Sequence, residues 1–427
     1  MIELILDYDS IRDGFSKVGC RLMAGRYFGK LMIKIMLGDS SVKKTKQIFA
    51  YLFLMLLGLG EANAEYALNM PKGVTRISND VYDLHMLILW ICVAIGVLVF
   101  GVMFYSIYYH RKSVGHQAEQ FHDNANIELL WTVIPTIILV VMAIPATKTM
   151  MQMDDVSEPD ITIKITGWQW KWEYDYLDSG VHFFSSLDAE SNQARQLGSG
   201  VEAADVDNYL LNVDNPLVLP VNKKIRFLLT ASDVIHSWWV PEFGWKKDNV
   251  PGFINDAWVS VEKPGIYRGQ CAELCGKDHG YMPIVVIAKE QAEYEQWLEE
   301  KKAQALAEAS SADRQWSQAE LIAKGSEVYQ ANCASCHMAD GQGVPGTFPA
   351  LAGSSVVTGP LDGEVSIVLN GRGMMPSFGA MLNASDLAAV ISFTRNGLSN
   401  KVGDSVQPLI IKPLLAAMTQ PEEDDDW

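Results

Sequence analysis

The sequence predicts a multidomain protein with a two-helix transmembrane hairpin, a β-sandwich and an all-α C-terminal domain. Two long uncharged segments in the first third of the chain predict the hairpin. Short strand-like segments separated by Pro, Gly and Asn predict the sandwich. A Cys-x-x-Cys-His motif within helical sequence predicts the third part. At 427 residues the chain has room for two or three domains.

The N-terminal region has the pattern of an export signal. A lysine-rich segment (43–46) precedes an apolar run (48–59), and Ala62-Asn63-Ala64 offers small residues for signal peptidase. We therefore expect residues 1–64 to be an N-terminal extension and a signal peptide, with cleavage before Glu65. The alternative is a cytoplasmic segment before an uncleaved helix, for which the apolar run is short.

Residues 65–155 predict the membrane hairpin. Leu84 to Tyr109 has no Asp, Glu, Lys or Arg over 26 residues, and Leu129 to Thr147 is a second uncharged run of 19 residues. His110-Arg111-Lys112 lies between them, and the positive-inside rule places this connection in the cytoplasm. The domains that follow are therefore expected on the periplasmic face of the membrane.

Residues 156–290 predict a β-sandwich. The strand-like segments are 161–166, 209–213, 225–230, 257–261 and 284–288. The segment 181–207 has little strand pattern and is expected to form a surface insertion. Trp168, Trp170 and Trp172 alternate, so on one strand their rings share a face.

One loop is dense in soft metal ligands. It reads Cys271-Ala-Glu-Leu-Cys275-Gly-Lys-Asp-His279-Gly-Tyr-Met282, a set that favours copper and electron transfer. Two thiolates four residues apart can bridge a pair of copper ions, and His236 is the best candidate for a second imidazole. The alternatives are a disulfide between the cysteines or a structural zinc site with the histidines. Neither explains the methionine.

The C-terminal third carries a c-type haem signature. Cys333-Ala-Ser-Cys336-His337 offers two thiols for covalent attachment and an imidazole for the iron. A high-potential haem also needs a methionine, for which Met374 and Met375 both qualify. We assign residues 317–402 to this haem domain.

Two further segments flank the haem domain. Residues 291–316, rich in Glu, Lys, Gln and Ala, predict a helical linker that tethers the haem domain at high effective concentration. Residues 403–427 predict an acidic tail. The 51 acidic against 34 basic residues give a net charge of −17, which argues against nucleic acid and favours a basic partner.

The chain from its first membrane helix to Met282 resembles subunit II of cytochrome c oxidase, with its dinuclear copper-A domain. The resemblance rests on the 271–282 motif, on His236 and on the aromatic run 167–174. The fused cytochrome c makes the chain similar to a caa3-type subunit II. The resemblance implies a cupredoxin-like copper domain and a class I cytochrome c domain.

The resemblance also implies a ligand set. In that family the two cysteines bridge both coppers, and His236, His279 and Met282 are terminal ligands. Glu273 contributes its backbone carbonyl, and its carboxylate faces a magnesium ion at the boundary with subunit I.

Three further roles follow from the resemblance. Trp170 matches the tryptophan through which electrons enter the copper centre, although core packing is the alternative. Glu128 matches a glutamate at the entrance of the K proton pathway, the alternative being an interfacial acid that starts a helix. Met375, directly before a proline, matches the haem ligand. Phe253 departs from the family, which has an arginine there.

We therefore expect an electron-transfer subunit of a proton-pumping haem-copper oxidase in the bacterial inner membrane. Electrons would pass from cytochrome c or its own haem c through copper A to the haem of subunit I, where oxygen is reduced to water. Expected partners are subunits I and III and a cytochrome c or bc1 donor. The alternatives are the copper-A subunit of a nitric oxide reductase-type complex and a copper-delivery or assembly protein, which would need no covalent haem.

Overall fold

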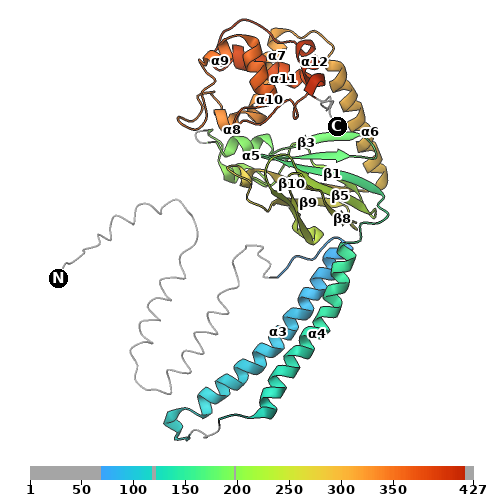
Figure 1. The fold of residues 1–427 in the computed structure, drawn as a ribbon, viewed down its shortest axis with the longest axis vertical. Helices are drawn as coiled ribbons and strands as arrows, with labels where there is room; N and C mark the ends of the chain where they lie inside the picture. The colour runs from blue at the N-terminus through green and yellow to red at the C-terminus, as the bar shows by residue number, and fades with distance from the viewer. Residues whose placement is uncertain (1–68, 118–121, 197–198, 419–427) are drawn as a thin grey trace, which may run out of the picture. The chain divides into compact units, whose positions relative to one another are not determined.

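The computed structural model describes residues 69–117, 122–196 and 199–418. The expected extension, the signal peptide and the acidic residues after position 418 lie outside the described residues. The described chain forms two long helices, a β-sandwich and a C-terminal helical domain (Figure 1). The predicted fold class is confirmed.

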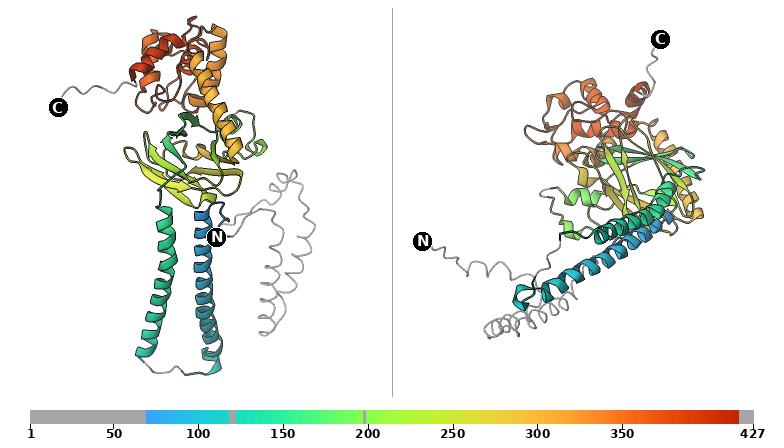
Figure 2. Two further views of the ribbon diagram at one scale, coloured as in Figure 1. Left: turned by 90° about the vertical axis from the view of Figure 1, so that its right-hand side faces the viewer. Right: turned by 60° about the horizontal axis from the view of Figure 1, so that its bottom comes forward.

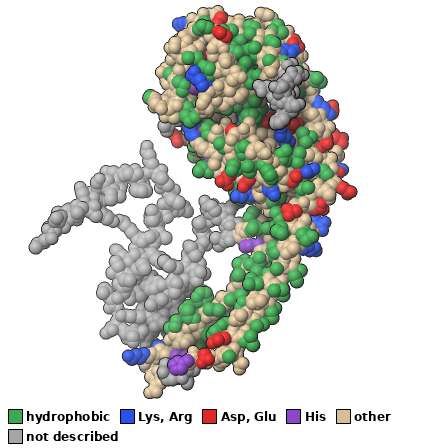
Figure 3. Space-filling view, viewed as in Figure 1, with side chains coloured by type: hydrophobic (Ala, Val, Ile, Leu, Met, Phe, Trp, Pro, Cys, Tyr) green, Lys and Arg blue, Asp and Glu red, His purple; other side chains and the backbone are tan. Residues whose placement is uncertain are grey.

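The hairpin consists of α3 (Arg76–Tyr109), the short helix η1 (Lys112–Val114) and α4 (Ala125–Met153). The long helices run side by side, joined at the end away from the sandwich (Figure 2). Both are long and apolar enough to cross a membrane. Hydrophobic side chains gather along them on the face seen in Figure 3, as expected for a surface that meets lipid.

Both helices are joined to the sandwich at the ends away from their connecting loop. Thr75 caps α3, and its hydroxyl donates a hydrogen bond of 3.2 Å to the carbonyl of Phe243. Ile77, in the first turn, is buried in the sandwich core. At the end of α4, the indole of Trp258 donates to the carbonyl of Gln152 at 3.0 Å. The hairpin is therefore attached to the sandwich by hydrogen bonds from both helices' ends and by a residue of α3 that is buried in the sandwich core.

The sandwich has two five-stranded sheets. The first has the order β3 (Val181–Ser185), β2 (Lys171–Tyr176), β1 (Ile161–Trp168), β5 (Ile225–Ala231), β8 (Asn255–Val259). The second has the order β4 (Leu217–Pro220), β10 (Pro283–Lys289), β9 (Gly265–Cys271), β6 (His236–Val240), β7 (Trp245–Asn249). The pairs β1–β5 and β4–β10 are parallel, and the other pairs are antiparallel.

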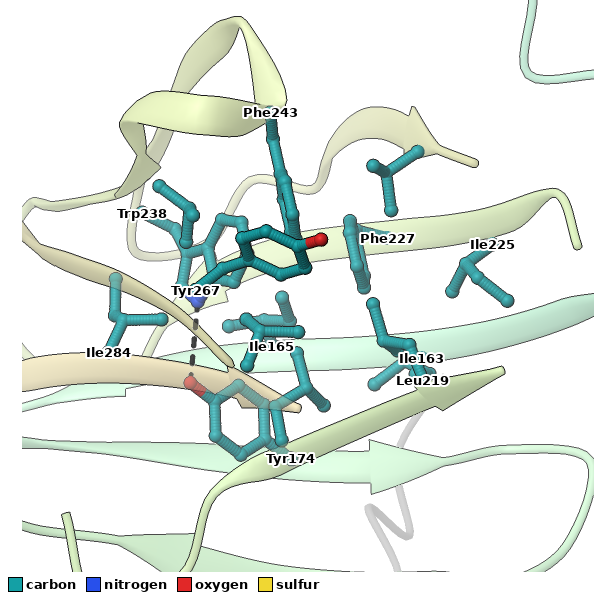
Figure 4. Packing of buried hydrophobic residues seen from close by; sticks show 14 of the residues in the cluster. Ile163, Ile165, Tyr174, Leu219, Ile225, Phe227, Trp238, Phe243, Tyr267 and Ile284 are labelled. Atoms are coloured by element: carbon teal, nitrogen blue, oxygen red, sulfur yellow. Dashed lines mark hydrogen bonds between the residues drawn. The ribbon is translucent and has the colours of Figure 1, made fainter. Parts of the chain in front are cut away.

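Alternation along the strands builds the core between the sheets. Ile225, Phe227 and Leu229 on β5 are fully buried, while the residues between them are partly exposed. Aromatic side chains fill much of the interior, and the indole of Trp238 donates to the hydroxyl of Tyr174 at 3.4 Å (Figure 4). This well-filled interior gives the ligand-bearing end a rigid support.

Three expectations for the sandwich are wrong. Segment 209–213 forms only an isolated bridge, between Val213 and Leu187. The expected insertion 181–207 begins with β3 and includes α5 (Ala189–Ala194) and η2 (Ala203–Asp205). The three alternating tryptophans do not share one strand, because a turn at 169–170 separates β1 from β2.

The C-terminal third is helical. It contains α6 (Gln291–Ser311), α7 (Gln318–Asn332), α8 (Ala334–His337), α9 (Ser355–Thr358), α10 (Leu361–Asn370), α11 (Ala384–Asn396) and α12 (Pro408–Met418). Helices α7 and α11 meet at Gly325, where a Cβ atom would lie 2.0 Å from the carbonyl oxygen of Ala389. Glycine permits this close crossing.

Helix α12 lies within the segment expected to be an acidic tail. Ile411 is fully buried in the haem-domain core, and Leu415 packs against that core. The apolar sequence of α12 therefore extends the domain beyond residue 402, and the acidic cluster begins only after this helix.

Candidate metal centre and haem cavity

The copper-ligand loop, residues 271–282, starts where β9 ends. Both cysteines are buried free thiols, and the Sγ atoms of Cys271 and Cys275 lie 3.8 Å apart. The carbonyl oxygen of Glu273 lies 3.4 Å from the sulfur of Cys271. His279, in η4 (His279–Tyr281), has its Nδ1 3.5 Å from the sulfur of Cys275, and the sulfur of Met282 is also 3.5 Å from it.

His236 completes the cluster from the neighbouring strand. It is the first residue of β6, which is antiparallel to β9, so the sheet register brings it to the loop. The ligand atoms of His236, Cys271 and Cys275 all lie within 4.8 Å of one another. Gly167 lies against the imidazole, and a Cβ atom there would be 2.8 Å from the ring.

The imidazole of His236 is oriented for a metal. Its Nε2 lies 2.9 Å from a carboxylate oxygen of Asp233, while its buried Nδ1 has no hydrogen-bond partner among the described residues. A buried nitrogen without a partner is costly, so this atom fits a ligand position. The carboxylate fixes the tautomer that leaves Nδ1 as the donor atom.

The thiols also suit metal binding. The hydrogen bond from Cys275 lowers the pKa of Cys271, whereas the same contact raises the pKa of Cys275. One thiolate is therefore favoured before any metal arrives, and the second requires the metal charge. Two sulfurs, two imidazoles, a thioether and a carbonyl form a soft donor set that fits copper, which when bound supplies a reversible one-electron couple.

Trp170, in the turn between β1 and β2, contacts the copper-ligand loop. Its indole nitrogen donates a hydrogen bond of 3.1 Å to the carbonyl of Cys275, and the side chain of Gln169 donates to the same oxygen at 2.8 Å. The backbone N–H of Gln169 donates to Asp233 at 2.7 Å. The same carboxylate therefore holds both the tryptophan turn and the imidazole of His236.

The other two tryptophans have different surroundings. Trp172 is fully buried, donates to the carbonyl of Met282 at 3.2 Å and lies edge-on to His236 with 6.0 Å between ring centroids. Trp168 donates to Glu173 at 2.8 Å and packs against the haem-domain core. Sequence reasoning missed Trp172, Gln169 and Asp233 as neighbours of the site; the Ser-Asp-Val-Ile-His spacing was the only available signal for the aspartate.

A cavity of about 420 Å³ lies in the haem domain and opens to the copper domain. Its walls include four residues of the attachment motif (Cys333, Ser335, Cys336 and His337), Met375 and, from the copper domain, Trp170. The size is within the range of small-molecule and cofactor sites. The donor set fits a covalent haem, which when bound supplies a second one-electron couple.

His337 and Met375, the two residues predicted to bind the haem iron, both line this cavity. The Nδ1 of His337 donates to the carbonyl of Pro349 at 2.8 Å, which leaves Nε2 as the nitrogen for iron. Met375 packs against the domain core, whereas the side chain of Met374 is 75% exposed. A β-bridge between the backbones of Arg372 and Met375 stabilises the turn that contains Met374 and Met375.

Two predicted residues lie outside these clusters. Glu128 is an exposed residue in the first turn of α4, whose N-cap is Asn124. The carboxylate of Glu273 is exposed, while its carbonyl faces the cysteine.

A membrane hairpin, a sandwich with a soft-ligand cluster and a helical domain with a haem-attachment motif together define a membrane-anchored electron-transfer protein. The family model described as the periplasmic domain of cytochrome c oxidase subunit II matches residues 161–289, and that of its transmembrane domain matches residues 63–149. The chain belongs to the cytochrome c oxidase subunit II family. Residues 320–393 match the model for subunit III of cbb3-type cytochrome c oxidase.

Individual proteins of this family are similar to parts of the chain. A probable cytochrome c oxidase subunit 2 of Rickettsia prowazekii is 40% identical over 237 residues, which cover 55% of this chain and 72% of the relative. Subunit 2 of Cereibacter sphaeroides is 34% identical over 234 residues, 53% of this chain and 77% of the relative. The crystal structure of the periplasmic domain of subunit II of Bradyrhizobium japonicum cytochrome oxidase is 41% identical, covers 35% of this chain and 98% of that chain, and has a TM-score of 0.31.

These matches confirm the expected family and its role. The chain is an oxidase subunit II with a fused cytochrome c domain, and it has an electron-transfer role in a haem-copper oxidase complex with other oxidase subunits. The matched domains imply copper A and haem as cofactors. The matches and the two apolar helices make it a membrane protein with a periplasmic domain.

Proposed function

We propose that this chain passes electrons from its own cytochrome c domain through its copper domain to the haem of subunit I, where oxygen is reduced to water and protons are pumped. The complex would lie in the bacterial inner membrane. One observation carries the proposal: Trp170 belongs to both sites. Its indole is hydrogen-bonded to the carbonyl of Cys275, and the residue lines the haem cavity.

The copper-domain residues have separate roles in this proposal. Cys271 and Cys275 would hold both coppers through their sulfurs, which the 3.8 Å between these atoms supports. His236, His279 and Met282 are terminal ligands, and Glu273 supplies its carbonyl. The unpaired Nδ1 of His236 and the approach of the other donors to the two sulfurs support these assignments.

The haem-domain residues hold the second centre. Cys333 and Cys336 would attach the haem through their sulfurs, and His337 and Met375 would bind its iron. The hydrogen bond from His337 to Pro349 supports Nε2 as the iron-binding atom. The partial burial of Met375 against the domain core supports it over its exposed neighbour.

Contacts outside the chain complete the proposal. The exposed carboxylate of Glu273 would face magnesium at the boundary with subunit I, and Glu128 would stand at a proton entrance on the cytoplasmic side of the hairpin. Cytochrome c or a bc1 complex would donate electrons, and subunit III would join the complex. The exposure of both carboxylates supports their availability to partners.

Metal analysis of the complex tests the proposal. We expect this chain to contribute two copper ions and one covalently bound haem to the complex, in addition to the metals of subunit I, with an electron paramagnetic resonance spectrum of a delocalised mixed-valence copper pair. A single-copper spectrum would contradict the bridging role of the cysteines. The haem type and gas substrate of the co-purified large subunit separate an oxygen-reducing complex from a nitric oxide reductase.

A further inference from the structure

The two segments that hold the metals touch each other. Lys277 lies in the copper-ligand loop, between its second cysteine and its histidine, and its Nζ donates a hydrogen bond of 2.7 Å to the backbone carbonyl of Ser335. Ser335 lies between the two cysteines of the haem-attachment motif. The same ammonium lies 4.8 Å from the ring centroid of Phe348, close enough for a cation–π contact.

Two more donors of the copper domain reach the same part of the haem domain. The Nζ of Lys171, next to Trp170, donates to the side-chain oxygen of Asn332 at 3.2 Å. The side chain of Asn192, on α5, donates to the carbonyl of Gln330 at 3.1 Å. The three acceptors therefore all lie within residues 330–335.

The last turn of α7 contains Gln330 and Asn332, and Ser335 follows directly in α8. The last turn of a helix leaves backbone carbonyls without intrahelical partners and carries the negative end of the helix dipole. Lys171 and Lys277 bring positive charge to that end. Lys171 is only 6% exposed, and burial lowers its pKa to about 8 against the attraction of Asp214. Such a lysine belongs to an interior contact.

Helix α6 is held at both ends, which the expected tether would not require. Near its start, Tyr294 is buried and Trp297 lies 5.4 Å from Tyr176 between ring centroids. At its end, the hydroxyl of Ser311 is 2.9 Å from that of Ser385 in the haem domain. The connection is therefore packed on both domains.

Building on the proposed function, we propose that Lys277 is a positioning residue that holds the haem-attachment motif against the copper-ligand loop. The partner it recognises is the carbonyl-rich end of α7 and the attachment motif in this same chain. The contact fixes the cytochrome domain beside Trp170, so internal electron transfer does not depend on a mobile tether finding its site. Lys171 and Asn192 support the same docked arrangement.

The test uses the full-length chain in its complex, with Lys277→Met, Lys277→Arg and the control Lys302→Met. Lys302 lies on α6, with its ammonium 2.9 Å from Glu299. Two quantities are measured: amide hydrogen exchange over residues 330–337, and the rate of haem-to-copper electron transfer after flash reduction. A charge-assisted hydrogen bond contributes roughly a tenfold change in a local equilibrium.

We expect Lys277→Met to speed the exchange and slow the transfer, each by about tenfold. Lys277→Arg should keep both rates close to wild type because its guanidinium can donate to the same carbonyl. Lys302→Met should change neither rate. Wild-type exchange or wild-type transfer in Lys277→Met would overturn the positioning role while leaving the proposed function intact. An absence of transfer in the wild-type protein would instead overturn the proposed function.

Discussion

The indole nitrogen of Trp170 donates a hydrogen bond of 3.1 Å to the backbone carbonyl of Cys275. This contact joins a turn between two strands to the loop that holds the copper ligands. Because Trp170 also lines the haem cavity, a single side chain connects the two metal-binding regions.

Replacing Trp170 with Gln should slow haem-to-copper transfer strongly while both metal spectra and the copper-domain fold remain. The ring is only partly buried, so its loss removes electronic coupling more than packing. Flash-initiated absorption changes measure the rate. Trp239→Gln, at an exposed position of β6, is the control. An unfolded copper domain, or an unchanged rate in a folded protein, would show that the ring is structural.

Met375 and Met374 should differ in their effect on the haem. Met375→Ala is expected to remove the sulfur-to-iron absorption band at the red end of the spectrum, because this side chain packs towards the domain core. Met374→Ala should keep the band, since that side chain is mostly exposed. The visible spectrum of the oxidised protein decides, and the reverse pattern would reassign the ligand to Met374.

Replacing the predicted copper ligands one at a time should have different effects on the copper centre. Met282→Leu should retain copper but change its paramagnetic resonance spectrum and potential, because a thioether is a weak terminal ligand. Cys271→Ser or Cys275→Ser should abolish the dinuclear form, since each sulfur would bridge both metals. Copper content and the resonance spectrum are measured together. Equal damage from all three changes would argue against these roles.

Glu364 should make the stability of the haem domain depend on pH. It is 4% exposed, accepts a hydrogen bond of 2.6 Å from Thr394 and lies 3.4 Å from a nitrogen of Arg395. Burial raises its pKa to about 7, above the value of 4.5 expected for an unfolded chain. The folded protein then binds more protons than the unfolded chain between these pH values, so stability falls as pH rises through that window.

The full effect is at most roughly 3 kcal/mol of unfolding free energy. We expect Glu364→Gln to remove most of the stability difference between pH 4.5 and pH 7 when haem absorbance follows denaturant unfolding. Glu327→Gln, at an exposed position of α7, should keep the wild-type dependence. A wild-type slope in Glu364→Gln would show that another group titrates.

The sequence was informative where the chemistry is local. The copper-ligand loop and the haem-attachment motif each lie within twelve residues or fewer, so their spacing alone predicted which side chains gather. His236 was identified as a partner, but its position at the start of β6 depends on the β6–β9 register, which a short apolar pattern does not define.

Contacts between distant segments were not predictable. The alternating tryptophans suggested one strand, because no Gly or Pro marks the turn at 169–170. Helix α12 was hidden by Pro413 and by the acidic residues after it, although it packs on α11 and buries Ile411 in the domain core. The hydrogen bond from Lys277 to Ser335 joins segments 58 residues apart in sequence, and nothing local indicates it.

The central claim is that the cytochrome and copper domains of one chain form a single path for electrons. Flash reduction of the haem in the purified complex, followed at haem and copper wavelengths over a range of protein concentrations, tests it most directly. The account predicts that haem reoxidation and copper reduction share one first-order rate that does not change with concentration. A rate that rises with concentration, or a haem that stays reduced while copper is oxidised, would contradict it.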